Sequence, residues 1–107
     1  MSPPKILQIQ DSNRKGKRFI AIIQDEDGDT VRIHFGQEGG STYIDHHDAD
    51  KRRAYWLRHS ANPLEARYID DLTLSPATLS AVLLWGPYRT LSENIDFLND
   101  MWNDTRK

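Results

Sequence analysis

The chain has 107 residues, of which 37% are hydrophobic and 28% are charged. This length and composition predict a single folded domain over residues 1–107 and exclude a long disordered tail. The absence of cysteine excludes disulfides and thiolate metal sites, and the net charge of −2 does not in itself predict a polyanionic partner. The longest apolar run, Ala81–Trp85, is much shorter than the about 20 residues of a membrane-spanning helix, so we expect no membrane span.

The first predicted elements form a small antiparallel sheet. Residues 1–17 are expected to hold an N-terminal edge strand followed by a polar loop. Over residues 18–36, apolar and more polar residues alternate on both sides of a turn, as they do in a β-hairpin. Asp27-Gly28 is a preferred two-residue hairpin turn, because both residues tolerate positive φ. Such a turn would pair Ile20 with Phe35 and place both on one apolar face. The hairpin is expected to end at Gly36, before a glycine-rich loop.

Three helices are predicted after the sheet, and each begins with a residue suited to cap its N-terminus. These residues are Asp48 for residues 48–60, Ser75 for residues 75–85 and Thr90, which forms a capping box with Glu93, for residues 91–103. Strands followed by helices predict an α+β fold, in which a hairpin and an edge strand are packed by about three C-terminal helices. Residues 64–74 are expected to be a connecting segment.

The apolar side of each predicted helix gives the expected core. For residues 48–60 this side is a thin stripe of Ala49, the Arg53 stem, Trp56 and Leu57. Trp56, Trp85 and Trp102 each lie on the apolar side of a predicted helix, so all are expected to be buried.

Two basic clusters are candidate partner-binding surfaces. The first is in the loop before the hairpin (Arg14, Lys15, Lys17 and Arg18), and the second follows the helix over residues 48–60 (Lys51, Arg52 and Arg58). Several Lys and Arg side chains on one surface could contact a nucleic-acid backbone. However, Asp48 can also pair with Arg52 one helical turn later, which would indicate an ordinary solvated face. We therefore expect protein partners and keep a nucleic-acid-binding accessory protein as an alternative.

Histidine and aspartate are concentrated between residues 34 and 59, which raises the alternative of a metal-dependent enzyme. Imidazole and carboxylate groups suit several transition metals, and the candidate ligands are His34, His46, His47, Asp48 and His59. The ligand spacing is not diagnostic, because adjacent histidines on a helix point to different sides. The acidic tip over residues 25–29 does not have the spacing of a calcium loop. We therefore predict no metal ligand and no cofactor.

A catalytic triad is the other enzymatic alternative. Ser41, Asp45 and one of His34, His47 and His59 could form one only if the fold gathered them, and no nucleophile-elbow motif is present. We therefore predict no catalytic residue and no enzymatic activity. For His59 we expect a contact with Asp45 or Tyr43.

Two long stretches carry a family resemblance: "VRIHFGQEGGSTYIDHHDADKRRAYWLRHS" and "DDLTLSPATLSAVLLWGPYRTLSENIDFL". Together they resemble a short protein family encoded by large nucleocytoplasmic DNA viruses of algae and protists. The residues that match its pattern include His34, Phe35, Gly36, Tyr43, His47, Arg53, Tyr55, Arg58, His59, Leu84, Trp85, Pro87, Leu91, Ile95 and Asp96. Asp48 departs from it, since members usually carry lysine there, and this loss of positive charge weakens the nucleic-acid hypothesis.

The resemblance implies a non-enzymatic virion component, such as a minor capsid or capsid-lining protein. Its expected location is the virion, with the host cytoplasm during assembly. Its expected partners are capsid proteins, contacted by the N-terminal segment, the loop Asn13–Arg18 and the exposed side of the helix over Lys51–Arg58.

Overall fold

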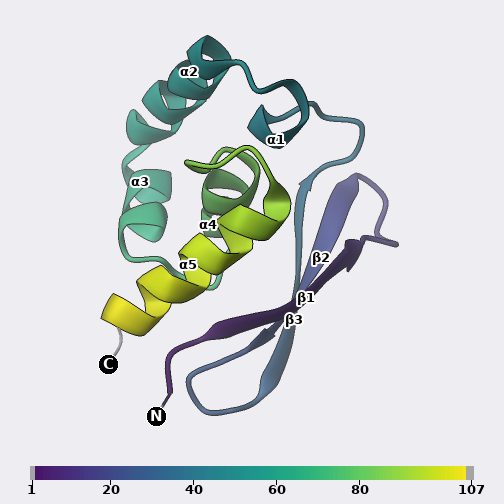
Figure 1. The fold of residues 1–107 in the computed structure, drawn as a ribbon, viewed down its shortest axis with the longest axis vertical. Coiled ribbons are helices and arrows are strands. Elements are labelled where there is room, and N and C mark those ends of the chain that lie inside the picture. Colours follow the sequence, from purple (N-terminus) through teal and green to yellow (C-terminus); the bar gives the residue numbers. More distant parts are fainter. Residues whose placement is uncertain (1, 106–107) are drawn as a thin grey trace.

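The computed structural model describes residues 2–105, which form a sheet followed by a set of helices (Figure 1). In chain order the elements are β1 (Lys5–Asp11), β2 (Lys17–Gln24), β3 (Thr30–Gln37), α1 (Tyr43–His46), α2 (Ala49–Ser60), α3 (Pro63–Asp70), α4 (Pro76–Leu79), the π-helix η1 (Ser80–Leu84) and α5 (Leu91–Thr105). The strands are antiparallel in the order β1-β2-β3. This arrangement confirms the predicted α+β class.

One face of the sheet packs against α4, η1 and α5 to make the main core. The sheet contributes fully buried Ala21, Ile23 and Phe35, and the helices contribute Leu83 and Trp102. The end of α5 lies beside β1 (Figure 1), where the Ile6 N–H donates to the Asn99 side-chain oxygen at 2.9 Å.

The register of the β2–β3 hairpin differs by one residue from the predicted one. Phe35 lies opposite Phe19, whereas the two-residue turn would have placed it opposite Ile20. The loop is longer because the Asp25 carboxylate accepts from the Asp27 and Asp29 N–H groups, and the Asp25 N–H donates to the Asp29 carbonyl at 2.8 Å. A shift of one residue turns the other face of β2 toward the core.

The shift explains which β2 residues are buried. Ala21 and Ile23 are completely buried, while Ile22 and Ile20, which was expected on the apolar face, lie on the opposite side of the strand. Gly28 does adopt the positive φ that its position suggested, at 88°. The turn residues therefore identified the hairpin, but an aspartate-supported loop determined its register.

All three predicted N-caps are present. The Asp48 carboxylate accepts from the N–H groups of Asp50 and Lys51 at the start of α2. The Ser75 hydroxyl accepts from the Thr78 N–H before α4, and the Thr90 hydroxyl accepts from the Glu93 N–H before α5. These bonds satisfy backbone donors that have no partner within their own helix.

Two short helices occupy segments for which no helix was expected: α1 lies in the predicted glycine-rich loop, and α3 covers part of the connecting segment. In α1, Thr42 and Asp45 form a reciprocal capping box. In α3, the Asn62 side chain accepts from the Leu64 and Glu65 N–H groups, and Pro63 occupies the first turn. The pair Asn62-Pro63 follows the end of α2 and has the cap-then-proline pattern of a helix start.

The predicted helix over residues 75–85 changes type part-way, from α4 to the π-helix η1. The chain leaving η1 is held by Asn94 of α5, which is fully buried. The Asn94 side-chain NH2 donates to the Leu83 and Tyr88 carbonyls, and its oxygen accepts from the Tyr88 N–H. A Cβ at Gly86 would lie 2.0 Å from the Val82 carbonyl oxygen, so this packing requires glycine.

Candidate functional site: a cleft beneath α2 and α3

The inward face of α2 differs from the predicted stripe. Ala49, Arg53 and Leu57 are exposed, and Leu57 has 67% of its surface accessible. The inward side chains are instead Arg52, Tyr55, Trp56 and His59, and Tyr55 forms a second small core with Ile69 and Ala81. Only Trp56 of the expected stripe faces inward, and Trp56 and Trp85 are half-buried, unlike Trp102.

Trp85, directly after η1, anchors α2 to the body of the protein. Its ring is stacked with that of Tyr55, with centroids 4.5 Å apart and planes at 6°. Its carbonyl oxygen accepts from the Trp56 indole N–H at 2.8 Å and from Arg52 Nε at 3.0 Å. Arg52 Nε also donates to the Gly86 carbonyl at 2.9 Å. Arg52, expected to bind a partner or Asp48, therefore supports the chain leaving η1.

His59 connects α2 to α3 and does not contact Asp45 or Tyr43 as expected. Its Nδ1 lies 2.5 Å from a carboxylate oxygen of Glu65, and its ring is 4.0 Å from that of Tyr55. Burial, reinforced by the Glu65 charge, raises the pKa of the Tyr55 hydroxyl above its ordinary range. The Tyr55 hydroxyl is therefore neutral, and its ring packs against those of Trp85 and His59.

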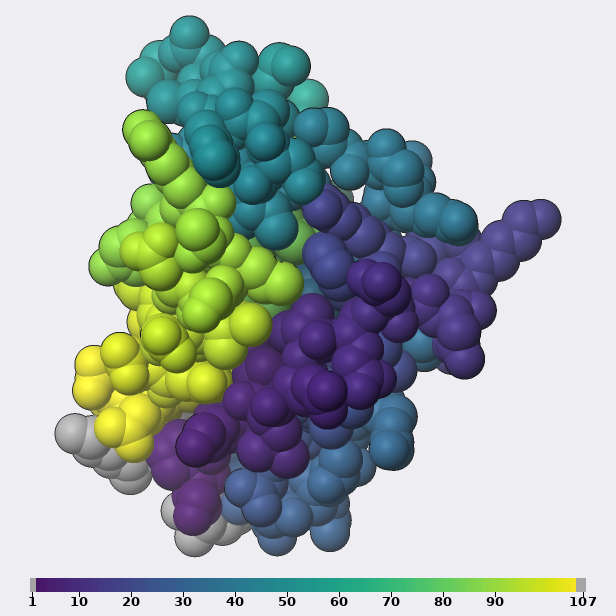
Figure 2. All heavy atoms as spheres, turned by 45° about the vertical axis from the view of Figure 1, so that its right-hand side comes forward, coloured from purple at the N-terminus to yellow at the C-terminus, as the bar shows by residue number. Residues whose placement is uncertain are grey.

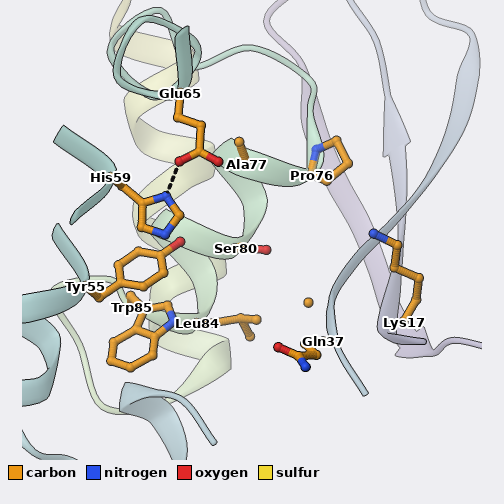
Figure 3. A pocket seen from close by; sticks show the side chains of 11 residues that line it. Lys17, Gln37, Tyr55, His59, Glu65, Pro76, Ala77, Ser80, Leu84 and Trp85 are labelled. Carbon is orange, nitrogen blue, oxygen red and sulfur yellow. Dashed lines mark hydrogen bonds and ion pairs between the residues drawn. The ribbon is translucent and has the colours of Figure 1, made fainter. Parts of the chain in front are cut away.

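A cleft of about 520 Å³ opens beside these residues. Figure 3 shows Lys17 and Gln37 on the wall formed by the sheet, opposite His59 and Glu65, with Ser80 between the two walls. The remaining lining residues are Gly36, Tyr55, Pro76, Ala77, Leu84 and Trp85. The cleft thus combines an apolar floor with polar groups at its walls, which is the usual composition of a binding site.

Most of the cleft was not predicted as a site. Of the candidate partner-binding residues only Lys17 lines it, while Glu65, Ser80 and Gln37 were not singled out. Glu65 could have been found had Asn62-Pro63 been interpreted as a helix start, because its first turn would then face the end of α2. Gln37 and Ser80 give no signal in sequence, because their positions depend on tertiary packing.

Arg18, also expected to bind a partner, is engaged within the protein. It donates two hydrogen bonds of 2.7 Å to the Asp45 carboxylate. The same carboxylate accepts from the Thr42 N–H at the start of α1. These bonds hold the pKa of Asp45 well below its usual range and raise that of Arg18. Gly36 packs beside this pair at φ 78°, where a Cβ would lie 3.1 Å from Leu84 and 3.2 Å from Arg18. The pair therefore fixes the connection between the sheet and α1.

The remaining basic residues stay accessible. Arg14 and Lys15 are exposed in the β1–β2 loop, which projects from the body in Figure 2. Lys51 and Arg58 are exposed on α2. These two line a smaller hollow that shares Trp85 with the main cleft. Residues of the two basic clusters thus line two hollows that have Trp85 in common.

The histidines proposed as metal ligands are not brought together. His34 lies on the sheet face away from the helices, where its Nδ1 is 2.7 Å from the Ser12 hydroxyl. His46 Nδ1 accepts from the Asp48 N–H, and exposed His47 ends α1 with a φ of 57°. Within residues 2–105, no three His, Cys, Asp or Glu side chains are close enough to hold a metal ion.

The helices described here include none that is both long enough and apolar enough to span a membrane.

Comparison with known proteins identifies relatives of this chain. Residues 7–59 match a family described as "Family of unknown function (DUF5754)". The chain is 36% identical over 80 residues to "Uncharacterized protein L851" of Acanthamoeba polyphaga mimivirus, a match that covers 74% of this chain and 80% of the relative. No solved structure matches the chain. The resemblance found in the sequence is confirmed, and the chain belongs to this family of large-DNA-virus proteins.

Proposed function

We propose that the protein is a non-enzymatic interaction protein, a minor capsid or other component of the particle of a large DNA virus. It binds a capsid protein with the cleft and the basic residues around it, in the virion and, during assembly, in the host cytoplasm. The observation that carries this proposal is that residues of two basic clusters far apart in sequence line two hollows that share Trp85. Lys17 lines the sheet wall, and Lys51 and Arg58 lie on α2 across Trp85.

Exposed apolar side chains on α2 and α3 support a protein partner. Leu57 on α2 is 67% exposed, and Leu64 and Tyr68 on α3 are 58% and 40% exposed. Leu64 and Tyr68 are one helical turn apart and therefore share a face. Apolar and aromatic side chains beside arginines are typical of protein–protein interfaces.

The aromatic contacts favour a protein over a nucleic-acid strand. Single-stranded nucleic acids stack their bases on free aromatic faces. Here Tyr55 is stacked with Trp85 and packs against His59, and the other neighbour of Trp85 is His46 at 5.4 Å. Arg18 and Arg52 are also engaged within the protein, so fewer cations are available to a phosphate backbone.

The geometry of the cleft favours binding over catalysis. His59 and Glu65 form a histidine–carboxylate pair, in which the carboxylate could orient the histidine as a general base. Ser80 lines the same cleft. Among the described residues, however, no hydrogen bond joins Ser80 to His59. The contact that would activate a serine nucleophile is thus not made.

The proposal is tested by quantitative mass spectrometry of gradient-purified virions and of the soluble fraction of infected cells. We expect the protein to co-purify with the capsid proteins at a fixed ratio and to form cross-links to one of them. A second sample carries Lys17→Glu, which places negative charge in the cleft, and it should lose these cross-links. Lys5→Glu, an exposed change at the start of β1, is the matched control and should retain them. Detection only in the soluble fraction would overturn the proposal.

A further inference from the structure

A second hollow, of about 270 Å³, shares Trp85 with the main cleft. Its lining residues are Ser41 and His46 from the α1 segment, Lys51, Ala54 and Arg58 from α2, and Trp85, which follows η1. Every ionisable or hydroxyl group among them can donate a hydrogen bond, and the lining contains no carboxylate. Such a lining is suited to an anion.

The two cations of the hollow have no partner among the described residues. Lys51 and Arg58 are seven positions apart on α2 and therefore project from the same face, with Ala54 between them. The two aspartates at the start of α2 make other contacts. Asp48 caps α2, and Asp50 lies 3.7 Å from Arg53. Within residues 2–105, no carboxylate therefore pairs with Lys51 or Arg58.

His46 supplies an independent observation. Its Nδ1 accepts from the Asp48 N–H at 2.9 Å, so the proton of the imidazole must be on Nε2. This Nε2 is buried and has no hydrogen-bond partner within residues 2–105. A buried donor without an acceptor is costly, and an acceptor that enters beside Lys51 and Arg58 would remove that cost. Because Lys51 and Arg58 are exposed and flexible, they can move to admit it.

We propose that this hollow binds a phosphate dianion, either free or as the terminal group of a monoester. Two cations balance its two charges, and the Ser41 hydroxyl and His46 Nε2–H can supply neutral donors to its oxygens. A carboxylate has one charge and two oxygens, so it would leave part of this set unused. A nucleic-acid backbone is not favoured, because its phosphodiester has a single charge and the Trp85 ring is already packed against those of Tyr55 and His46. The proposal does not depend on the proposed virion role.

The first experiment titrates the whole protein with inorganic phosphate at constant ionic strength, followed by calorimetry and by NMR of the histidine side-chain nitrogens. We expect saturable binding and a shift of His46 Nε2, whereas His34, on the far face of the sheet, should not respond. Phenyl phosphate, a monoester, should bind within about threefold of inorganic phosphate, and the diester dimethyl phosphate at least about tenfold more weakly, because it lacks one charge.

The second experiment uses a matched pair of variants on α2. Arg58→Ala should weaken phosphate binding at least about tenfold, because it removes a charge-assisted donor. Arg53→Ala removes the same charge from an exposed site outside the hollow and should leave the affinity unchanged. Equal weakening by both variants would show that only overall charge matters and would overturn the proposal. An unresponsive His46, or an oligonucleotide that binds without competition from phosphate, would overturn it too.

Discussion

Trp102 of α5 is completely buried in the main core, whereas Trp56 of α2 and Trp85, which packs against α2, keep part of their surface in solvent. The main core is held by non-directional burial of aliphatic and aromatic side chains. The region under α2 is held by a ring stack and by hydrogen bonds to the Trp85 and Gly86 carbonyls. The difference indicates that the helices bordering the cleft can be perturbed while the sheet and α5 stay folded.

The largest effect is expected in the main core. Trp102→Ala should lower the free energy of unfolding by about 4 kcal/mol, because it leaves a cavity and removes the indole N–H bond to the Leu72 carbonyl. Urea denaturation followed by circular dichroism measures this loss. A loss below about 1 kcal/mol would mean that the core does not depend on this side chain.

Trp85→Ala tests the region under α2. Its expected cost is about 2 kcal/mol, because the ring is half-buried and stacked on Tyr55. Hydrogen exchange should become faster in α2 and α3 but not in β2 or α5, since Trp85 packs only at the edge of the main core and all fully buried residues of that core remain. Uniformly faster exchange would show that the main core and the region under α2 unfold as one unit, so that the helices bordering the cleft are not independent of the sheet and α5.

A smaller effect, dependent on pH, is expected at the ion pair between the sheet and α1. Because the pKa of Asp45 is lowered in the folded state, its ionised form stabilises the fold above the unfolded-state pKa of about 4. This stabilisation is lost as pH falls further. Asp45→Asn should therefore cost about 1 kcal/mol at neutral pH, and the difference from the unaltered protein should shrink below pH 4.

The control for this experiment is Asp50→Asn. Asp50 is 89% exposed and lies 3.7 Å from Arg53, so its replacement should change stability little at any pH. Unfolding is measured by urea titration at several pH values for all three proteins. If the cost of Asp45→Asn stays constant from neutral pH down to acid, the ion pair with Arg18 does not contribute as described.

The part of the fold that could be predicted from sequence is the part determined by local chemistry. Caps such as Asp48 and Ser75 act within one helical turn, so the helices that they begin were predicted. The hairpin register was wrong because the Asp25 side chain bonds two N–H groups of the loop and lengthens it. The two-residue turn and the longer loop differ little in free energy, and the Asp27-Gly28 pair alone does not show which of them forms.

The candidate site was less predictable, because it depends on long-range contacts. Arg18 and Arg52 had the sequence signal of free surface cations, but each has a partner far away in sequence, Asp45 and the Trp85 carbonyl. The inward face of α2 was also missed, since Tyr55 and His59 are polar-tipped residues that become buried only through Trp85 and Glu65. A helical pattern of hydrophobic residues does not identify such side chains as facing inward.

The smallest effect on stability is expected at Leu57, which separates folding from binding on the same helix. Leu57→Ser should change the free energy of unfolding by less than about 0.5 kcal/mol, because the side chain is 67% exposed. Tyr55→Ser, two positions away, removes the ring that packs on Trp85 and His59 and should cost several times more. The pair is compared by urea denaturation and by cross-linking in purified virions. If Leu57→Ser leaves stability intact but reduces cross-links to a capsid protein, the outer face of α2 is part of the interface. If stability and cross-links are both unchanged, the interface is confined to the cleft and its basic rim.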